Sequence, residues 1–506
     1  MFWADQYAQD LKKRKLVLEW VDDMKTPSGR VHVGALRGVI LHDLIFKTLA
    51  QAGVNSIYSY VINDMDPMDS LPIYLPEGFT QYMGKPLYKI PSPGKDFDSY
   101  AQYYAQEFIS VFNRLNCHPK IIWSHELYES GKMDKVVREC LDKTEEIKAI
   151  YEGTHKKDLG VWSPFQVICP KCGKLGSTKV TGWDGENVSF SCLPDKVAWA
   201  VGCGYSGKIS PFGGSGKLLW KIDWAAHWKT LGVTCEWAGK DHMTKGGSYE
   251  ITAKICQDVL GYRPPDARLY EHLLLGGRKM SSSKGIGASA IEIAKILPPE
   301  VLRFLMVRVH YKTAINFDPS GNTIPDLFDE YDEFANYYYE FGVKSDYGRI
   351  WQLSQVAKIP EQKPLFPRFR DIANFIQSPS IDIYKKFEKV DKKILEERIK
   401  YAKIWLKTYA PEDIKFEVKD SNVEIDNEQK KYLHELIKLV GDRDWEPEKL
   451  QQEMYELSKK MGIQPKKAFQ SIYLTLFGKT FGPKAAWLIL ENKKKVLKRL
   501  GEAVKL

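Results

Sequence analysis

The sequence predicts an α/β Rossmann-like domain with a parallel sheet and a cysteine-rich insertion, followed by an all-α C-terminal region. Three observations predict this organisation. The first 62 residues show the pattern of a strand, a glycine-bearing turn, a helix and a second strand. Four of the eight cysteines fall within one 35-residue window. Beyond about residue 320 the strand signal fades, and amphipathic helical segments follow proline-bearing breaks at 317–326 and 358–369.

Length and composition limit the class of protein. The chain has 506 residues, more than the ~250 of one ordinary domain, so several domains are expected. Its 43% hydrophobic and 27% charged residues exclude a disordered or fibrous protein. No apolar stretch approaches the ~18 residues that cross a bilayer, and we therefore expect a cytoplasmic protein.

A βαβ unit opens the chain, with strands expected at 15–21 and 57–62 and a helix at 35–51. Its crossover places the first turn and the end of the second strand at one edge of a parallel sheet. Glycine N–H groups and the helix dipole suit this turn to phosphate, although an ordinary strand-to-helix turn has a similar composition. The candidate nucleotide-binding residues are Pro27, Ser28, Gly29, His32, Gly34 and Ala35.

A second loop, residues 276–285, again follows a predicted strand. Its sequence, GGRKMSSSKG, offers two lysines, three hydroxyls and three glycines, which suit it to gripping a pyrophosphate. Taken alone, a basic loop is more often solvated surface. The candidate residues are Lys279, Met280, Ser281, Ser282, Ser283 and Lys284.

Together the two loops resemble the signature motifs of class I aminoacyl-tRNA synthetases. Residues 26–35 correspond to the HIGH element and 279–283 to the KMSKS element. Residues 218–250 and 474–487 are similar to segments of the class I lysyl-tRNA synthetases found mainly in archaea. The resemblance covers essentially the whole chain.

Two positions depart from the wider class. Ala35 stands where the class has His and this family usually has Asn, and we expect activity to survive in weakened form. Ser282 replaces a lysine in the second motif, and Lys284 follows two residues later, which is the usual form in this family. Lys279 and Lys284 are therefore expected to share the contacts with phosphate.

The resemblance implies activation of L-lysine by ATP and Mg²⁺ to lysyl-adenylate, and transfer of the lysyl group to the 3′-terminal ribose of tRNA(Lys). It gives catalytic roles to His32, Lys279 and Lys284. The implied domains are a catalytic domain at 1–150 and 211–275, an insertion at 151–210, a connective region at 276–330 and a helical anticodon-binding domain at 331–506.

Selecting lysine requires a carboxylate for the ammonium group and an apolar wall for the stem. Candidates from the strand ends and the family segments are Gly29, Asp64, Asp66, Trp220, Asp241 and His242. Each has an ordinary structural alternative, because strand-end aspartates cap turns, a histidine can be hydrogen-bonded in the interior and a tryptophan can belong to the core.

Four cysteines predict a structural Zn²⁺ site in the insertion: Cys169, Cys172, Cys192 and Cys203. Ten residues separate the last two, so a second CxxC is missing and His155 is an alternative ligand. Four reduced, buried cysteines without metal are the other possibility.

The C-terminal end is basic. The net charge is 74 − 65 = +9, and residues 461–506 carry ten Lys and Arg against two acidic residues. Lys479 and Lys484, near Phe481 and Trp487, are candidate tRNA contacts, because cations and aromatic rings together bind unpaired bases. Solvated lysines on a packed helix would look similar.

Three rival functions stay open at this level. Another class I synthetase, such as a glutamyl-type enzyme, shares both motifs but needs a cationic pocket for its acidic substrate. A smaller nucleotidylyltransferase shares the first motif without the basic helical end. A non-catalytic tRNA-binding paralogue is supported only by Ala35.

Overall fold

The computed structural model describes residues 1–156, 158–277, 288–377, 382–412, 414–416, 424–441, 443–491 and 493–505. The chain forms two compact units. The first comprises Met1–Asp318 and Phe334–Ile359, and the second comprises Pro319–Glu333 and Pro360–Leu506. Helix α11 (Thr323–Phe341) contributes residues to both units.

A parallel sheet organises the first unit. Strands β1 (Glu19–Lys25), β2 (Ser56–Ile62) and β3 (Lys120–Trp123) pair in that order. Parallel bridges from Cys235 to Val21 and to Asp266 widen the sheet on the far side of β1. Two shorter parallel pairs follow, β9 (Ala238–Gly239) with β10 (Leu269–Tyr270) and β11 (Leu273–Leu275) with β12 (Ile315–Phe317). Ligands bind at the carboxyl edge of such sheets.

The predicted βαβ unit is confirmed, with one shift. Strand β1 begins at Glu19 instead of residue 15. Helix α1 (Trp3–Lys12) ends three residues before the predicted strand start at residue 15. Lys15 then adopts a left-handed conformation with φ of 53°, so the strand cannot include it. Helix α2 (Leu36–Gln51) starts one residue after its predicted position.

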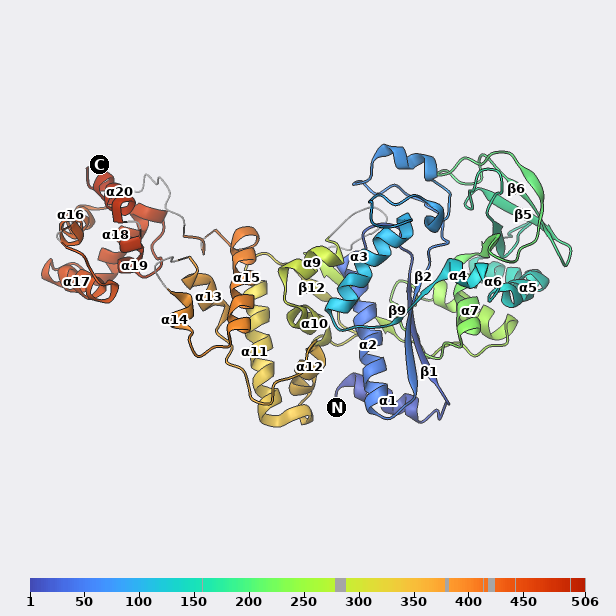
Figure 1. Cartoon of the computed structure of the whole chain (residues 1–506), viewed down its shortest axis with the longest axis horizontal. Helices are drawn as coiled ribbons and strands as arrows, with labels where there is room; N and C mark the ends of the chain where they lie inside the picture. Colours follow the sequence, from blue (N-terminus) through green and yellow to red (C-terminus); the bar gives the residue numbers. More distant parts are fainter. Residues whose placement is uncertain are drawn as a thin grey trace. The chain divides into compact units, whose positions relative to one another are not determined.

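Helices cover both faces of the sheet. On one face α1 and α2 form a core with Val21, Tyr58 and Trp237. On the other face α7 (Trp220–Leu231) and α8 (Ser248–Lys254) bury Trp224 and Trp228. Figure 1 shows α2 beside β1 and β2, with α7 on the other side of these strands. The remaining helices of this unit are α3 (Tyr100–Arg114), α4 (Ser124–Glu129), α5 (Asp134–Asp142), α6 (Thr144–His155), α9 (Ala290–Ile296), α10 (Pro299–Val307) and α12 (Asp346–Ser354).

An antiparallel insertion lies between α6 and α7, as the cysteine spacing suggested. Strand β4 (Phe165–Val167) pairs with β8 (Gly216–Leu218). Between them β5 (Thr178–Trp183), β6 (Val188–Cys192) and β7 (Ser206–Ile209) form a three-stranded sheet. The outer pair brings the end of the insertion back beside its start, and α7 begins two residues after β8.

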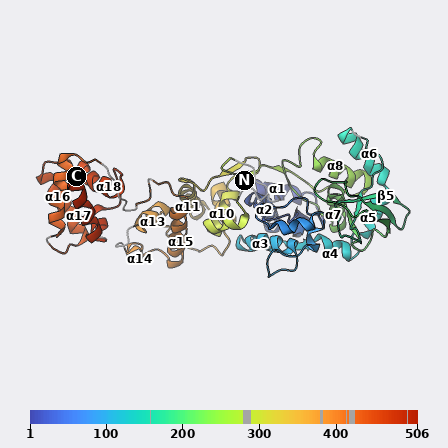
Figure 2. The same ribbon diagram turned by 90° about the horizontal axis from the view of Figure 1, so that it is seen from above.

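The second unit is helical, which confirms the all-α prediction. No strand follows β12 in the part of the chain that the structure describes. Its helices are α13 (Phe369–Phe375), α14 (Ile383–Lys386), α15 (Lys392–Thr408), α16 (Asn427–Gly441), α17 (Pro447–Lys460), α18 (Pro465–Phe477), α19 (Ala485–Glu491) and α20 (Lys493–Lys505). Apolar faces of α16–α20 enclose one core, and Figure 2 shows α16, α17 and α18 grouped together. Among the described residues, no helix is long and apolar enough to cross a membrane.

Candidate active site

The loop between β1 and α2 forms a tight turn at the carboxyl edge of the sheet. It ends in a 3-10 turn at Val33–Ala35, where the Ala35 N–H donates to His32 O at 3.0 Å. A side-chain carbon on Gly34 would lie 2.9 Å from His32 Nδ1 and 3.2 Å from Leu273 O, so the packing requires glycine. Helix α2 starts immediately afterwards, which brings its positive dipole end to the turn.

Backbone hydrogen bonds join this first loop to the segment that follows the second loop. The Val33 N–H donates to Ala288 O at 3.1 Å, and the Ala290 N–H donates to Val31 O at 2.8 Å. Ser289 forms an antiparallel β-bridge with His32. It is also the N-cap residue of α9, where it makes a capping box with Glu292. The end of the second loop is therefore fixed beside His32.

The start of the second loop is also anchored. The Gly277 N–H donates to Asn316 Oδ1 at 2.7 Å, and the Gly276 N–H donates to Phe317 O at 3.2 Å. The loop thus leaves β11, which touches Gly34, and returns beside His32. The predicted phosphate contacts Lys279, Met280, Ser281, Ser282, Ser283 and Lys284 lie outside the described residues.

Asp66, which follows β2, is tied to the first loop and to a buried lysine. The Thr26 hydroxyl donates to Asp66 Oδ2 at 2.5 Å, and Lys217 Nζ lies 2.6 Å from Asp66 Oδ1. Lys217 Nζ is also 2.9 Å from Asp223 Oδ2. Burial opposes the charge of Lys217, but the two carboxylates raise its pKa above the ordinary value, and the pKa of Asp223 is lowered in return.

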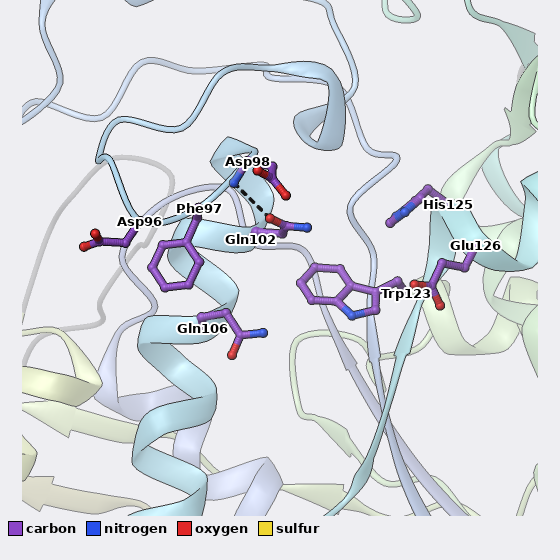
Figure 3. Close-up of a pocket in the computed structure, with 8 residues that line it drawn as sticks. All are labelled: Asp96, Phe97, Asp98, Gln102, Gln106, Trp123, His125 and Glu126. Carbon is purple, nitrogen blue, oxygen red and sulfur yellow. Dashed lines mark hydrogen bonds between the residues drawn. The ribbon is translucent and has the colours of Figure 1, made fainter.

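Asp64 is buried and pairs with His125, which follows β3. The His125 N–H donates to Asp64 Oδ1 at 3.0 Å, and His125 Nδ1 contacts Asp64 Oδ2. Burial opposes protonation of His125, yet its hydrogen bond to Asp64 raises its pKa above the ordinary value. A polar cavity of about 360 Å³ lies beside this pair, and Figure 3 shows Gln102 and Gln106 of α3 facing Trp123, His125 and Glu126 across it.

Sequence reasoning missed His125 and Lys217. A signal existed for His125, because it lies two residues after β3 and so obeys the strand-end rule that selected Asp64. Nothing local marked Lys217, which lies in the short strand β8 at the end of the insertion and reaches Asp66 only through tertiary folding.

The structure brings together two of the predicted lysine contacts. Trp220 is 43% exposed at the start of α7, and its ring centre lies 5.8 Å from that of His242. Trp220 also stacks on Trp224 with a ring separation of 6.0 Å. Asp241 is exposed, and its Oδ1 lies 3.2 Å from His272 Nε2. The indole and imidazole form a wall of the kind that an aliphatic stem needs.

All four cysteines of the insertion meet at one point. The sulfur atoms lie within 4.8 Å of one another, with 3.6 Å between Cys169 and Cys203 and 3.7 Å between Cys172 and Cys192. A tetrahedral Zn²⁺ with Zn–S bonds of ~2.3 Å places its sulfurs ~3.8 Å apart, so the cluster fits this ion. Burial raises the pKa of the Cys172 thiol to about 12, and a bound cation would be needed to hold four thiolates at neutral pH.

The two predicted tRNA contacts of the second unit have different surroundings. Lys479 Nζ donates to Lys415 O at 2.6 Å and lies 5.2 Å from the centre of the Phe416 ring. Lys484 Nζ lies 4.6 Å from the Trp487 ring centre and lines a cavity of about 440 Å³. Lys479 thus bridges segments of its own unit, whereas Lys484 faces an open hollow.

Comparison with known proteins agrees with this arrangement. Residues 1–357 match the family described as tRNA synthetases class I (K), and residues 383–504 match the anticodon binding domain family. The chain is 34% identical to the lysine–tRNA ligase of Archaeoglobus fulgidus, with 97% of each chain covered. It is 32% identical to that of Methanosarcina barkeri, covering 98% of this chain and 96% of the relative.

Among solved structures, the glutamate tRNA ligase of Elizabethkingia meningosepticum matches with a TM-score of 0.46 and 13% identity, over 96% of this chain and 99% of that one. The family match covers the sheet, both loop anchors and the insertion. The chain therefore belongs to the class I (K) family of tRNA synthetases.

Proposed function

We propose that the protein is a lysine–tRNA ligase, which activates L-lysine with ATP and transfers it to tRNA(Lys). The observation that carries the proposal is the backbone pairing of residues 31–33 with 288–290, which holds both loops of the active site together. Relatives named lysine–tRNA ligase match over nearly the whole chain. Because these relatives are named as enzymes that charge tRNA, we also propose a cytoplasmic location for the protein.

The proposed reaction needs positioning and charge stabilisation, and no protein nucleophile. The lysine carboxylate would attack the α-phosphate of ATP in line, releasing pyrophosphate. His32, Gly34 and the start of α2 are suited to the charge that develops on the phosphate, and Lys279 and Lys284 are proposed to bind the pyrophosphate. Mg²⁺ would accompany the ATP and neutralise part of its charge.

The cysteine cluster is proposed to hold a structural Zn²⁺ through Cys169, Cys172, Cys192 and Cys203. The sulfur separations support this assignment, and with four thiolate ligands no position stays open for a substrate. The ion would hold the small sheets of the insertion, whose strands are too short to form a large core.

The second unit is proposed to bind the anticodon region of the tRNA. The cavity beside Lys484 is lined by aromatic rings, including Phe481, which is 54% exposed. A cation next to exposed rings suits unpaired bases on a phosphate chain. Lys479 and Lys484 stay proposed contacts.

Pyrophosphate exchange with each of the twenty amino acids tests the activation step. Lysine alone should support exchange well above background. Exchange that depends on glutamate would instead favour the glutamyl-type alternative, and no exchange with any amino acid would favour the non-catalytic paralogue.

A further inference from the structure

Two buried carboxylates, Asp22 and Glu236, face the same side of the sheet without a cation. Val21 pairs with Cys235 across neighbouring parallel strands, and the Asp22 N–H donates to Cys235 O at 3.0 Å. Asp22 and Glu236 are the next residues along each strand, so both side chains point to the face covered by α7. Both are almost fully buried, at 0% and 2% exposed.

The hydrogen bonds of the two carboxylates leave one oxygen unused. Glu236 accepts indole N–H groups on both oxygens, from Trp224 at 2.9 Å and from Trp228 at 2.5 Å. Asp22 Oδ1 accepts the Ser59 hydroxyl. Asp22 Oδ2 is buried and has no partner among the described residues. An unpaired buried carboxylate oxygen is costly, and native proteins keep few without a reason.

Charge makes the arrangement more unusual. Burial and the neighbouring Glu236 raise the pKa of Asp22, and burial raises the pKa of Glu236 to about 7. Within the described residues, no ion pair involves either carboxylate. Asp23 and His42 pair with each other on the opposite face, and their charges shift the pKa of Glu236 in opposite directions, Asp23 raising it and His42 lowering it. This site thus has hydrogen-bond acceptors on two carboxyl groups that burial drives toward their neutral forms, and no ion-pairing cation of its own among the described residues.

The predicted aspartates are engaged elsewhere. Asp64 holds His125, Asp66 holds Lys217 and Thr26, and Asp241 lies beside His272. An ammonium ion at those positions would compete with an existing donor. At Asp22 Oδ2 an ammonium ion would supply the hydrogen-bond donor that this oxygen lacks.

Location and reach also fit lysine. Asp22 precedes the end of β1 by three residues, or about 10 Å of strand. An extended lysine side chain spans about 6 Å from Cα to Nζ, and a hydrogen bond adds about 3 Å. The aromatic wall described above continues toward the pair, because Trp224 contacts Trp220 and His242 with its ring and Glu236 with its N–H.

We propose that Asp22 Oδ2 receives the ε-ammonium group of the substrate lysine, with Glu236 adding negative charge behind it. This proposal rests on the proposed function and names the residues that select its amino acid. The indoles of Trp224 and Trp220 would line the methylene stem. Asp22 is therefore a specificity residue that makes no contact with the reacting phosphate.

The test compares lysine with norleucine, which has the same carbon chain without the ammonium group, in pyrophosphate exchange by the full-length protein. The wild type should prefer lysine by about 10⁴-fold in kcat/KM, because its buried acceptors stay unpaired with norleucine. Asp22→Asn should raise the KM for lysine by about 100-fold and reduce the preference to the same degree, with the KM for ATP unchanged. Asp22→Glu, which retains the charge, should recover part of the preference.

Asp23→Asn is the matched control, since it changes the next residue of the same strand on the other face. It should retain the preference for lysine. Thermal unfolding without lysine gives the second readout, where Asp22→Asn should equal or exceed the wild type because it removes a buried carboxyl group with an unpaired oxygen. An Asp22→Asn protein that keeps the full preference, or that is less stable than the wild type or fails to fold, would overturn the inference alone. A wild type that cannot use lysine would instead contradict the proposed function.

Discussion

Asp66 and Asp22 are both mostly buried carboxylates of the first unit, but among the described residues only Asp66 has hydrogen-bond donors for both of its oxygens. Asp66 receives Lys217 and Thr26, at 2.6 and 2.5 Å, and so joins the insertion to the first loop. Asp22 Oδ2 receives nothing from the described residues. The comparison teaches that a buried carboxylate paired with a cation of the protein stabilises the fold, whereas a buried carboxyl oxygen without a donor is available to a cationic ligand.

The largest expected effect comes from removing the internal cation. Lys217→Met should lower the free energy of unfolding by ~3–5 kcal/mol, because it leaves Asp66 and Asp223 buried with like charges. Chemical unfolding at pH 7 measures this change. Lys208→Met is the control, since Lys208 pairs with Asp184 on the surface and should cost below ~1 kcal/mol. Equal losses in the two variants would break the comparison.

The same network predicts how the effect of Lys217→Met depends on pH. Because the folded-state pKa of Asp223 is lowered, its contribution to stability is complete above the unfolded pKa, about 3.9, and is lost as the pH falls toward the folded value. The gap between wild type and Lys217→Met should therefore stay constant from pH 5 to 8 and shrink below about pH 4. A gap that widened in acid would show that Asp223 is not the partner that matters.

His32 is proposed to contact the ATP phosphates. His32→Ala should slow lysyl-adenylate formation by ~10²-fold or more, which corresponds to ~3 kcal/mol, while thermal stability changes little. Single-turnover activation measures the rate. An unchanged rate would remove His32 from the proposed catalytic residues.

The cysteine cluster is a second candidate ligand site, and here the proposed ligand is a metal. Wild-type protein should contain about one equivalent of zinc, and replacing both Cys169 and Cys172 with Ser should release it and destabilise the insertion. Elemental analysis measures the zinc content, and limited proteolysis within residues 158–210 measures the stability of the insertion. Cys256→Ser, at a buried thiol outside the cluster, should retain the zinc. Metal-free wild-type protein would contradict the site.

The smallest expected effect separates the two lysines of the second unit. Lys484→Ala should weaken tRNA binding and flatten the log–log salt dependence by about one unit, because Lys484 faces the cavity. Lys479→Ala should weaken tRNA binding less than Lys484→Ala and should also lower stability, since it loses the bond to Lys415 O. Filter binding across salt concentrations distinguishes them. Identical slopes of the salt dependence for the wild type and Lys484→Ala would show that Lys484 makes no contact with tRNA phosphate and is only solvated.

The sequence predicted what local patterns determine. Hydrophobic spacing placed β2 and α2 within one residue, and the cysteines that the spacing selected do meet. The motif residues 26–35 lie at the carboxyl end of β1, as the βαβ pattern requires. Residues 279–284 lie outside the described residues, so their contacts stay predictions.

Tertiary pairing determined the rest. Asp22 and Glu236 are 214 positions apart and become neighbours only because the strand containing Cys235 joins the sheet beside β1. The predicted strand ended at residue 21, which assigned Asp22 and Asp23 to the turn after it, so their burial within β1 was not expected. Lys217 had no local signal, because a lysine is usually exposed and only the tertiary fold buries this one.

The central claim is that this chain attaches lysine to tRNA, and the most direct measurement identifies the amino acid on the product. Full-length protein is incubated with ATP, Mg²⁺, all twenty amino acids and a tRNA mixture, and the esterified amino acid is released and identified by mass spectrometry. The account predicts lysine, on tRNA(Lys) alone. Glutamate or another amino acid on the recovered tRNA, or tRNA that stays uncharged by active, folded protein, would contradict it.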